Sequence, residues 1–271
     1  MTSTATARPV SQSRRQPAAL LSALEPTRAW VEFGAFLGTW PALQLAPRGD
    51  GHPVIVLPGF FAGDASTRVL RSYLRSLGYA VSGWSLGRNR GPTRAVLSGM
   101  DDLVAKVVQD QGRPASIIGW SLGGIFARQI ASRRPADVRQ VITLASPYRL
   151  NRGDRTRATR LYDRYAPSHV TVADFPGAGG GYQALPMPAT SIYTRTDGVV
   201  AWQTCTEPET SRSQNIEVFS SHCGVGHHPA AMYAIADRLA QPVDRWLPFQ
   251  APKLIRHLYP SHLYPSHLYP S

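Results

Sequence analysis

The stretch that decides the fold is Ala115-Ser116-Ile117-Ile118-Gly119-Trp120-Ser121-Leu122-Gly123-Gly124-Ile125-Phe126. A short apolar run, typical of a buried strand, is followed by a segment with helical spacing. The junction, Gly119–Gly123, fits G-x-S-x-G, a pattern that presents a serine on a sharp strand-to-helix turn. On such a turn the hydroxyl is exposed above the sheet, and the next backbone N–H faces the same space. The pattern therefore indicates Ser121 as a candidate nucleophile.

The same pentapeptide, Gly-Trp-Ser-Leu-Gly, also occurs at Gly83–Gly87. A strand is expected before this copy, but the residues at 87–92 are Gly-Arg-Asn-Arg-Gly-Pro. Two glycines and a proline in six residues favour a loop, so the helix N-terminus that would face a developing oxyanion is missing. We predict that Ser121 is the nucleophile and that Ser85 belongs to a chance repeat.

Strand-like runs alternate with helical patterns along most of the chain. The expected strands are 54–57, 79–84, 115–119, 138–144, 190–193 and 216–219. The expected helices are one that Asp64 caps, one over 93–111, one after Ser121 and one that begins near Pro229. This alternation predicts an α/β fold with a mostly parallel central sheet and helices on both faces.

Composition changes divide the 271 residues into one domain and its extensions. We expect a disordered N-terminal arm over 1–16 and a single domain over 17–248. Within it, an arginine-rich segment and a glycine cluster interrupt the alternation, which predicts a small cap insertion over about 147–186 with a flexible loop. The tail, 249–271, contains three copies of His-Leu-Tyr-Pro-Ser, whose regular prolines argue against a helix or a core strand.

Residues 17–44 are rich in apolar side chains at helical spacing, and Pro26 is expected to start or kink the second part of this helix. Packing on the main domain is the favoured interpretation. Peripheral contact with a lipid interface is the alternative.

The net charge is +12, and all but two of the 29 basic residues are arginine. Coding bias toward arginine is the favoured explanation, and attraction to an anionic surface is the other. No basic block with interleaved aromatic residues occurs, so we do not expect nucleic-acid binding. No standard signal peptide or membrane-spanning run is recognised, which predicts a cytoplasmic protein.

The acid and the base of a triad are expected after Ser121 in the chain. Asp197 follows the strand at 190–193, and His222 follows the strand at 216–219. Other aspartates are interpreted as solvated charges: Asp101, Asp102, Asp163 and Asp174. His227 and His228 are rival bases, but both adjoin Pro229, where a capping or surface role suffices. The loop 58–63 lies where a second oxyanion donor is needed, so the backbone N–H groups of Phe60 and Leu122 are the predicted oxyanion hole.

Together, residues 54–60, 119–124, 191–197 and 222–225 resemble the α/β-hydrolase superfamily, in particular small bacterial lipases and carboxylesterases and actinobacterial α/β-hydrolases. The resemblance covers about 51–247, and it departs from the family at Pro58, where a histidine is usual. It implies a serine hydrolase that cleaves carboxylic esters of small molecules or lipids through an acyl-enzyme, without metal or organic cofactor. Acyl transfer by the same triad, or a non-catalytic binding role, are the alternatives.

Cys205 and Cys223 are the only cysteines, which excludes a disulfide-stapled scaffold. A disulfide between them would join the loops of Asp197 and His222. Two buried free thiols are the alternative, which a reducing cytoplasm would favour. The sequence leaves both open.

Overall fold

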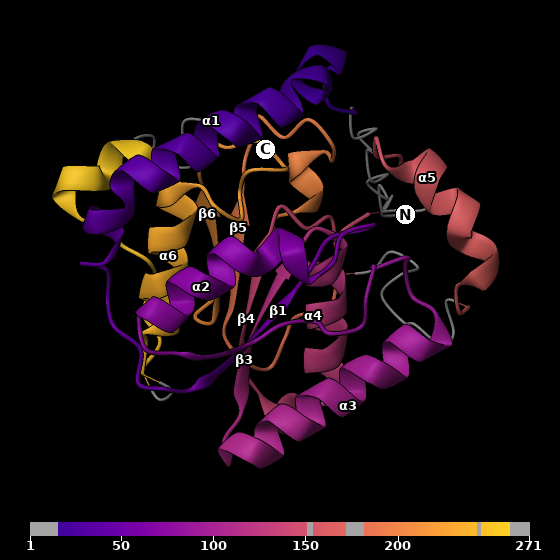
Figure 1. Ribbon diagram of the computed structural model, residues 1–271, viewed down its shortest axis with the longest axis horizontal. Helices are drawn as coiled ribbons and strands as arrows, with labels where there is room; N and C mark the ends of the chain where they lie inside the picture. Colours follow the sequence, from indigo (N-terminus) through magenta and orange to yellow (C-terminus); the bar gives the residue numbers. More distant parts are fainter. Residues whose placement is uncertain (1–15, 151–153, 172–181, 243–244, 261–271) are drawn as a thin grey trace, which may run out of the picture.

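The computed structural model describes residues 16–150, 154–171, 182–242 and 245–260. Within this part, six strands form one sheet in the order β2-β1-β3-β4-β5-β6, and every neighbouring pair is parallel (Figure 1). The strands are β1 (Pro53–Leu57), β2 (Ala80–Ser82), β3 (Ala115–Trp120), β4 (Val138–Leu144), β5 (Ala189–Tyr193) and β6 (Ser213–Glu217). The expected parallel α/β architecture is confirmed.

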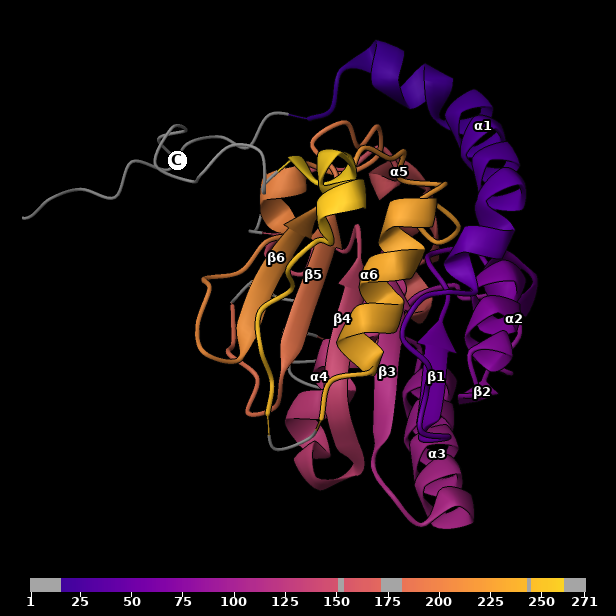
Figure 2. The same ribbon diagram turned by 90° about the vertical axis from the view of Figure 1, so that its left-hand side faces the viewer.

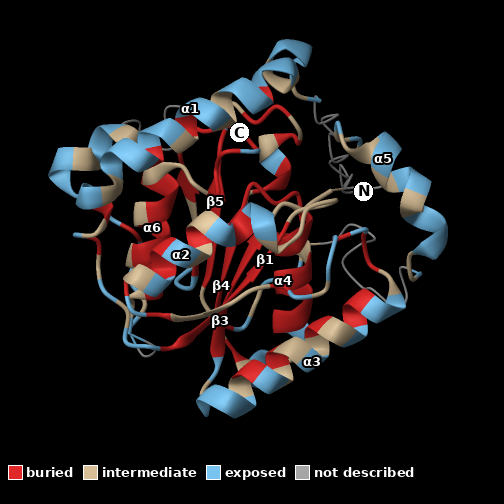
Figure 3. Cartoon of the chain, in the orientation of Figure 1, coloured by how far each residue is buried: buried red, intermediate tan, exposed pale blue. Residues whose placement is uncertain are grey.

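Helices cover both faces of this sheet. The α-helices are α1 (Ala19–Leu43), α2 (Arg68–Ser76), α3 (Arg94–Gln111), α4 (Leu122–Arg133), α5 (Thr159–Tyr165) and α6 (Pro229–Leu239). Short 3-10 helices are η1 (Asp64–Thr67), η2 (Pro135–Asp137), η3 (Ala166–Ser168), η4 (Trp202–Thr204) and η5 (Lys253–Leu258). Because side chains alternate along each strand, Val54 and Val56 pack under α1, α2 and α6, whereas Ile55 and Leu57 pack under α3 and α4. Figure 3 shows the sheet as buried, with α1 and α5 mostly exposed.

Two helix starts agree with the capping signals in the sequence. Thr93 is the N-cap of α3, where its hydroxyl accepts a hydrogen bond from Val96 N at 3.2 Å, and Pro229 lies in the first turn of α6. The predicted capping role of Asp64 is wrong. Its carboxylate instead accepts hydrogen bonds from the backbone N–H groups of Trp84 and Ser85, at 2.8 and 2.9 Å.

The last strand lies earlier than the apolar pattern predicted. β6 ends at Glu217, and the side chain of Phe219 is 57% exposed beyond it. The first residues of the strand, Ser213-Gln214-Asn215, are polar, and their side chains have hydrogen-bond partners: Gln214 Oε1 accepts from Phe249 N at 2.7 Å, and Asn215 Nδ2 donates to the Glu207 carbonyl at 2.7 Å. The pattern of apolar residues was therefore a poor guide at this position.

The apolar N-terminal segment forms one helix of 25 residues, in which both Pro26 and Pro41 are internal. It packs on the main domain, as favoured, with Phe36 and Leu43 in the core beside α6. Figure 2 places α1 at the end of the sheet toward which the strands point. In the part of the chain that the structure describes, no helix has the length and apolar character to cross a bilayer.

The expected tail begins as part of the core, which corrects its boundary. Tyr259 is fully buried, its ring packs on Phe249 at 4.9 Å, and its hydroxyl donates to the Ala230 carbonyl at 2.8 Å. The segment up to residue 260 thus belongs with the domain. Residues 1–15 of the predicted arm, the glycine cluster of the predicted cap, and the His-Leu-Tyr-Pro-Ser copies at 262–266 and 267–271, with the last residue of the first copy, lie outside the described residues.

Candidate active site

Ser121 occupies a sharp turn between β3, which ends at Trp120, and α4, which begins at Leu122. Its φ of 51° lies in the left-handed region, which is costly for a residue with a side chain. Two hydrogen bonds hold the turn: Ser121 N donates to the Leu144 carbonyl at 2.8 Å, and Ser146 Oγ donates to the Ser121 carbonyl at 2.6 Å. The ends of β3 and β4 thus fix the serine in a strained conformation.

Glycines on both sides of Ser121 allow α4 to approach the sheet. A Cβ on Gly119 would overlap the carbonyl oxygen of Gly123. A Cβ on Gly123 would overlap the Leu57 carbonyl oxygen and lie 2.7 Å from that of Pro58. These neighbours are backbone atoms, so a side chain at either position would force the helix away from β3 and β1.

The structure brings Ser121, His222 and Asp197 together in one chain of hydrogen bonds. His222 Nε2 lies 3.1 Å from Ser121 Oγ, and His222 Nδ1 lies 2.7 Å from Asp197 Oδ2. The other carboxylate oxygen of Asp197 accepts from Val199 N and Val200 N, each at 2.7 Å. Asp197 and His222 are both buried. This is the geometry of a nucleophile, a base and a group that orients the base.

The surroundings of His222 favour its protonated form. Burial lowers the pKa of the imidazole, but the charge of Asp197, its hydrogen bond and the charge of Glu25 outweigh that effect. The pKa of His222 is therefore raised above its ordinary value of 6.5. A raised pKa suits a base that must accept a proton and hold it before returning it.

The loop after β1 passes directly beside the serine. A Cβ on Gly59 would lie 3.3 Å from Ser121 Cβ, so Phe60 follows a residue that lies against the serine. Asn89 bonds to this loop at two points. Its side chain donates to the Pro58 carbonyl at 3.0 Å, and its backbone carbonyl accepts from Phe61 N at 2.6 Å. Sequence reasoning missed Asn89. The oxyanion role of the Phe60 and Leu122 N–H groups stays a prediction.

The second copy of the pentapeptide forms a similar turn, but the turn leads into a loop instead of a helix. Ser85 also has a positive φ, of 56°, but a loop follows it, as predicted. Trp84 is fully buried, stacks on Phe126 of α4 with ring centroids 6.1 Å apart, and donates its indole N–H to the Gly87 carbonyl. This copy leads into the loop that carries Asn89, so it supports the neighbouring Phe60 loop.

Helix α5 brings aromatic rings to the same place. Phe60 lies 5.3 Å from Tyr162 and 6.3 Å from Tyr165, and Phe61 lies 5.6 Å from Tyr165, measured between ring centroids. Burial raises the pKa of Tyr162 to about 12. The predicted cap therefore supplies an aromatic cover for the Phe60 loop, while its role as a lid stays a prediction.

The rival histidines have other environments. His227 Nε2 bonds to the Ala29 carbonyl at 2.9 Å, and its ring packs edge-on against Phe33. His228 Nδ1 is buried and has no hydrogen-bond partner among the described residues. His227 is therefore bound to α1, and the hydrogen bonds of Ser121 and Asp197 go to His222 rather than to either rival.

Both cysteines are free thiols, Cys205 buried and Cys223 exposed. The disulfide that would have joined the two loops is therefore not formed, and the expectation of two buried thiols holds only for Cys205.

Another connection between these loops was missed by sequence reasoning: Glu25 of α1 accepts hydrogen bonds from the backbone N–H groups of both Gly198 and His222.

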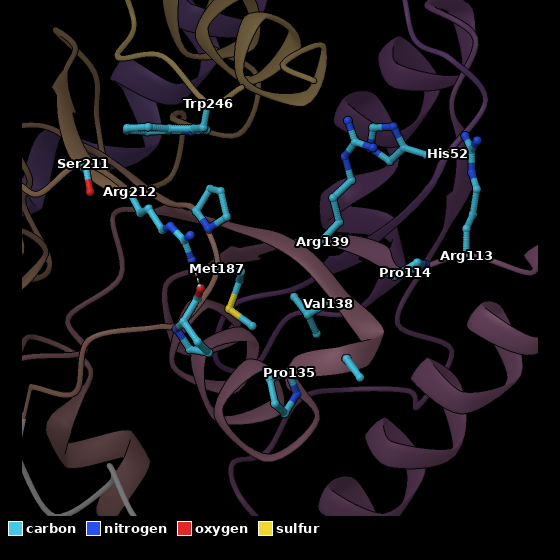
Figure 4. Close-up of a pocket in the computed structure, with 13 residues that line it drawn as sticks. His52, Arg113, Pro114, Pro135, Val138, Arg139, Met187, Ser211, Arg212 and Trp246 are labelled. Atoms are coloured by element: carbon cyan, nitrogen blue, oxygen red, sulfur yellow. Dashed lines mark hydrogen bonds between the residues drawn. The ribbon is translucent and has the colours of Figure 1, made fainter. Parts of the chain in front are cut away.

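A cavity of about 740 Å³ lies at the opposite end of the sheet (Figure 4). Its walls come from the segments that enter the strands, including His52, Arg113, Arg139 and Arg212. None of the three residues of the hydrogen-bond chain lines it. Across the residues that the structure describes, no group of three or more His, Cys, Asp or Glu side chains is arranged to hold a metal ion.

Comparison with known proteins shows the fold and gives partial sequence matches to two curated esterases. No protein-family model matches the chain. Over 105 residues, 39% of this chain, it is 30% identical to a pimeloyl-acyl carrier protein methyl ester esterase of Shewanella woodyi. Over 109 residues it is 28% identical to the enzyme of the same name from Aliivibrio salmonicida. Each match spans 40% of the relative's length.

Three solved structures share the overall architecture. Aspergillus fumigatus lipase B superimposes with a TM-score of 0.57 at 18% identity, over 71% of this chain and 53% of that one. A pyrethroid hydrolase superimposes with a TM-score of 0.52 at 16% identity, over 72% of this chain and 99% of that one. A Bacillus licheniformis lipase superimposes with a TM-score of 0.52 at 12% identity, over 73% of this chain and 95% of that one. The chain therefore has the α/β-hydrolase fold.

Proposed function

We propose that this protein is a serine hydrolase that cleaves carboxylic esters. The observation that carries the proposal is the hydrogen-bond chain from Asp197 through His222 to Ser121, with the serine on the turn that begins α4. The partial similarity to methyl ester esterases and the shared fold with two lipases support the same reaction class. Fold alone does not determine an activity, so the proposal stands on the geometry of these three residues.

In the first half of the reaction, Ser121 Oγ attacks the ester carbonyl carbon while its proton passes to His222 Nε2. The tetrahedral intermediate then collapses, its C–O bond to the alcohol breaks, and His222 returns the proton to the leaving alkoxide. In the second half, His222 takes a proton from water, and the resulting hydroxide attacks the acyl-enzyme. The acid product leaves, and Ser121 regains its proton.

Asp197 has an orienting role in this scheme. Its hydrogen bond to Nδ1 keeps the proton on that nitrogen, which leaves Nε2 free to accept the proton of Ser121. The N–H groups of Val199 and Val200 hold the carboxylate in turn, so it cannot rotate away. The Phe60 and Leu122 N–H groups, together with the N-terminus of α4, are the proposed stabilisers of the oxyanion.

The aromatic surroundings favour a substrate with an apolar part. Phe60 follows Gly59, which lies against Ser121, and its ring packs on Tyr162; such an aromatic surface suits an acyl chain or an apolar alcohol. We therefore propose small-molecule or lipid esters as the substrate class.

A fluorophosphonate probe and a series of p-nitrophenyl esters test the proposal. We expect the probe to label Ser121, as mapped by peptide mass spectrometry, and we expect Ser121→Ala to lose both labelling and turnover. Ser85→Ala is the matched control, because it changes the same position of the identical pentapeptide; it should keep both. Wild-type turnover in Ser121→Ala, with an unchanged melting temperature, would refute the assignment.

A further inference from the structure

We infer that helix α1 positions the catalytic loops: Glu25, Arg28 and Glu32 hold the segments that carry Asp197 and His222 in the geometry of the triad. This inference rests on the proposed function and deepens it. The three residues do not touch the reacting atoms, so they are positioning residues. Nothing in the apolar pattern of α1 suggested this role.

The orientation of α1 is the first observation. Glu25 and Glu32 are only 3% and 9% exposed, whereas Trp30 and Val31 are 74% and 69% exposed. The spacing 25, 28, 32 places the three charged residues on one face of the helix. A helix that turns its acidic face inward and a tryptophan outward gives up hydrophobic burial and removes two carboxylates from water. Such carboxylates are tolerated only where hydrogen bonds replace the lost water.

Glu25 connects the acid loop with the base loop. Its Oε1 accepts from Gly198 N at 2.8 Å and from His222 N at 3.0 Å, and its Oε2 accepts from Cys223 N at 2.8 Å. Gly198 directly follows Asp197 in the chain, so one carboxylate bonds to the base itself and to the neighbour of the acid. The distance between Asp197 and His222 therefore depends on Glu25.

Glu32 holds the residues just before His222. Its Oε1 accepts from Ser221 N at 2.6 Å, and its Oε2 accepts from Ser221 Oγ at 2.8 Å and from Ser220 Oγ at 3.1 Å. Both carboxylate oxygens are thus used. Because a hydrogen bond to a charged group is stronger than one between neutral groups, this contact fixes the backbone that leads into the base.

Arg28 connects the same two loops with the opposite charge. Its Nη1 donates to the Thr196 carbonyl at 2.7 Å, and its Nη2 donates to the Ser220 carbonyl at 2.7 Å. The guanidinium lies 3.9 Å from Glu25, so it also offsets the charge of that carboxylate. The planar guanidinium, which donates in fixed directions, spans both loops at once.

Glycines in both loops leave room for the helix. A Cβ on Gly198 would lie 2.6 Å from the Leu21 carbonyl oxygen, and a Cβ on Gly224 would overlap Glu32 Oε2. Trp120, next to Ser121, donates its indole N–H to the His222 carbonyl at 3.0 Å and secures the loop from the opposite side. The base is therefore held between α1 and the nucleophile turn.

The decisive variant is Glu25→Gln, which keeps the size of the side chain but loses its charge and one acceptor oxygen. We expect kcat to fall at least about tenfold with less than a threefold change in KM, because displacement of a catalytic group lowers the rate more than substrate binding. The charged groups that face His222 are Asp197 from the loop after β5 and Glu25 from α1, with Arg28 and Glu32 behind them. Removal of the Glu25 charge should therefore move the acid limb of kcat/KM to lower pH.

Two further variants keep the test decisive. Arg28 is partly exposed, so Arg28→Ala should fold even where Glu25→Gln does not, and it should also lower kcat at least about tenfold. Glu207→Gln is the matched control, because Glu207 is equally buried but pairs with Arg128 of α4. It should lower the melting temperature and leave the pH profile unchanged.

Wild-type kcat and pH profile in folded Glu25→Gln or folded Arg28→Ala would overturn the inference and leave α1 as a structural cover. That result differs from failure of the proposed function, in which the wild-type protein itself would neither hydrolyse esters nor label at Ser121. A fall in kcat accompanied by the shifted pH profile would support the inference.

Discussion

Ser85 and Ser121 occupy the same position of the same pentapeptide, and both have a positive φ. The pentapeptide thus produces the same local turn twice. The two serines differ in what surrounds that turn: Ser121 Oγ is hydrogen-bonded to a histidine that also bonds to an aspartate, whereas Ser85 N is held by the carboxylate of Asp64. A local motif determines the backbone conformation, and distant residues determine whether the hydroxyl has a base.

Replacement of Asp197 by asparagine tests the orientation of that base. We expect kcat to fall roughly 10⁴-fold, because a neutral amide cannot stabilise the imidazolium and would favour the wrong tautomer, as in other Ser-His-Asp triads. Steady-state kinetics on a p-nitrophenyl ester measure the effect. Asp163→Asn, at an exposed position of α5, should have wild-type rates. A decrease of less than about tenfold in Asp197→Asn would contradict the role given to this residue.

The raised pKa of His222 predicts the pH dependence of catalysis. The base must be neutral, so kcat/KM should rise through a midpoint above 6.5, the ordinary pKa of the side chain. The contribution of protonated His222 to the free energy of unfolding changes in the other direction from the rate. It is fully present below the pKa of His222 in the unfolded chain, and it is lost as pH rises through the pKa in the folded protein. A pH–rate profile measures the first effect. A midpoint below 6.5 would show that Asp197 and Glu25 do not outweigh burial.

Because both cysteines are free thiols, we expect a reductant to leave the stability of the protein unchanged. Cys223 is exposed, but partial desolvation of its thiol, and then the charge of Glu25, raise its pKa to about 12, whereas burial raises the pKa of Cys205. Because the thiolate is the reactive form, both should alkylate slowly with iodoacetamide at pH 8 and rapidly in denaturant. Dithiothreitol should leave the melting temperature unchanged. A native mass two hydrogens below the reduced mass would reveal a disulfide instead.

At the level of secondary structure, the strand-turn-helix unit depends on close contact between backbones. Gly123→Ala would press a methyl group against the carbonyl oxygens of Leu57 and Pro58, so we expect both lower stability and at least about a 100-fold loss of kcat. Gly87→Ala is the matched control, at the same position of the other pentapeptide. A new Cβ there meets no atom within 4 Å, and its φ of +74° should cost only about 1 kcal/mol of stability. Melting temperatures and kcat for the two variants test this difference.

The elements that the sequence predicts well are those whose apolar residues face inward. β1 is a continuous apolar run and β3 and β4 are mainly apolar, because both faces of a parallel sheet are covered, and α3 and α6 carry local start signals at Thr93 and Pro229. The turn at Ser121 was equally readable, because its glycines and its following helix are contiguous in the chain.

The role of α1 could not be predicted in the same way. Hydrophobic periodicity assumes that polar residues face water, but Glu25 and Glu32 are buried and find their partners almost 200 positions later in the chain. Asn89 was missed for a related reason. It lies in a loop whose only sequence signal was the absence of a helix, while its contacts with Pro58 and Phe61 arise from tertiary packing.

For the molecule as a whole, parallel strands explain how distant residues meet. Ser121, Asp197 and His222 follow β3, β5 and β6, and Phe60 follows β1, so all four lie at the carboxyl edge of one sheet. α1 packs at this same edge and bonds to two of the loops. The fold therefore assembles the candidate site from the ends of four strands, and a helix from the N-terminal part of the chain is bonded to two of its loops.

Acid stability of the whole domain depends on a histidine outside this site. Burial, and then the charge of His227, lower the pKa of His228 from 6.5 to about 4, and its Nδ1 has no partner among the described residues. The unfolded chain therefore binds more protons than the folded one in this range. The stability that neutral His228 provides is present above pH 6.5 and is lost as pH falls toward 4, by no more than about 2 kcal/mol at pH 5.

His228→Gln isolates this effect, because glutamine stays neutral at every pH and the carboxylates are the same in both proteins. Urea unfolding at pH 7.5 and pH 5 should show that the wild type loses more stability on acidification than the variant, by on the order of 1 to 2 kcal/mol. Protonation of His222 stabilises the folded state over part of this pH range. Because His222 is present in both proteins, its contribution cancels when the two changes in stability are compared. Parallel stability curves for the two proteins would mean that folded His228 takes up its proton as readily as the unfolded chain does.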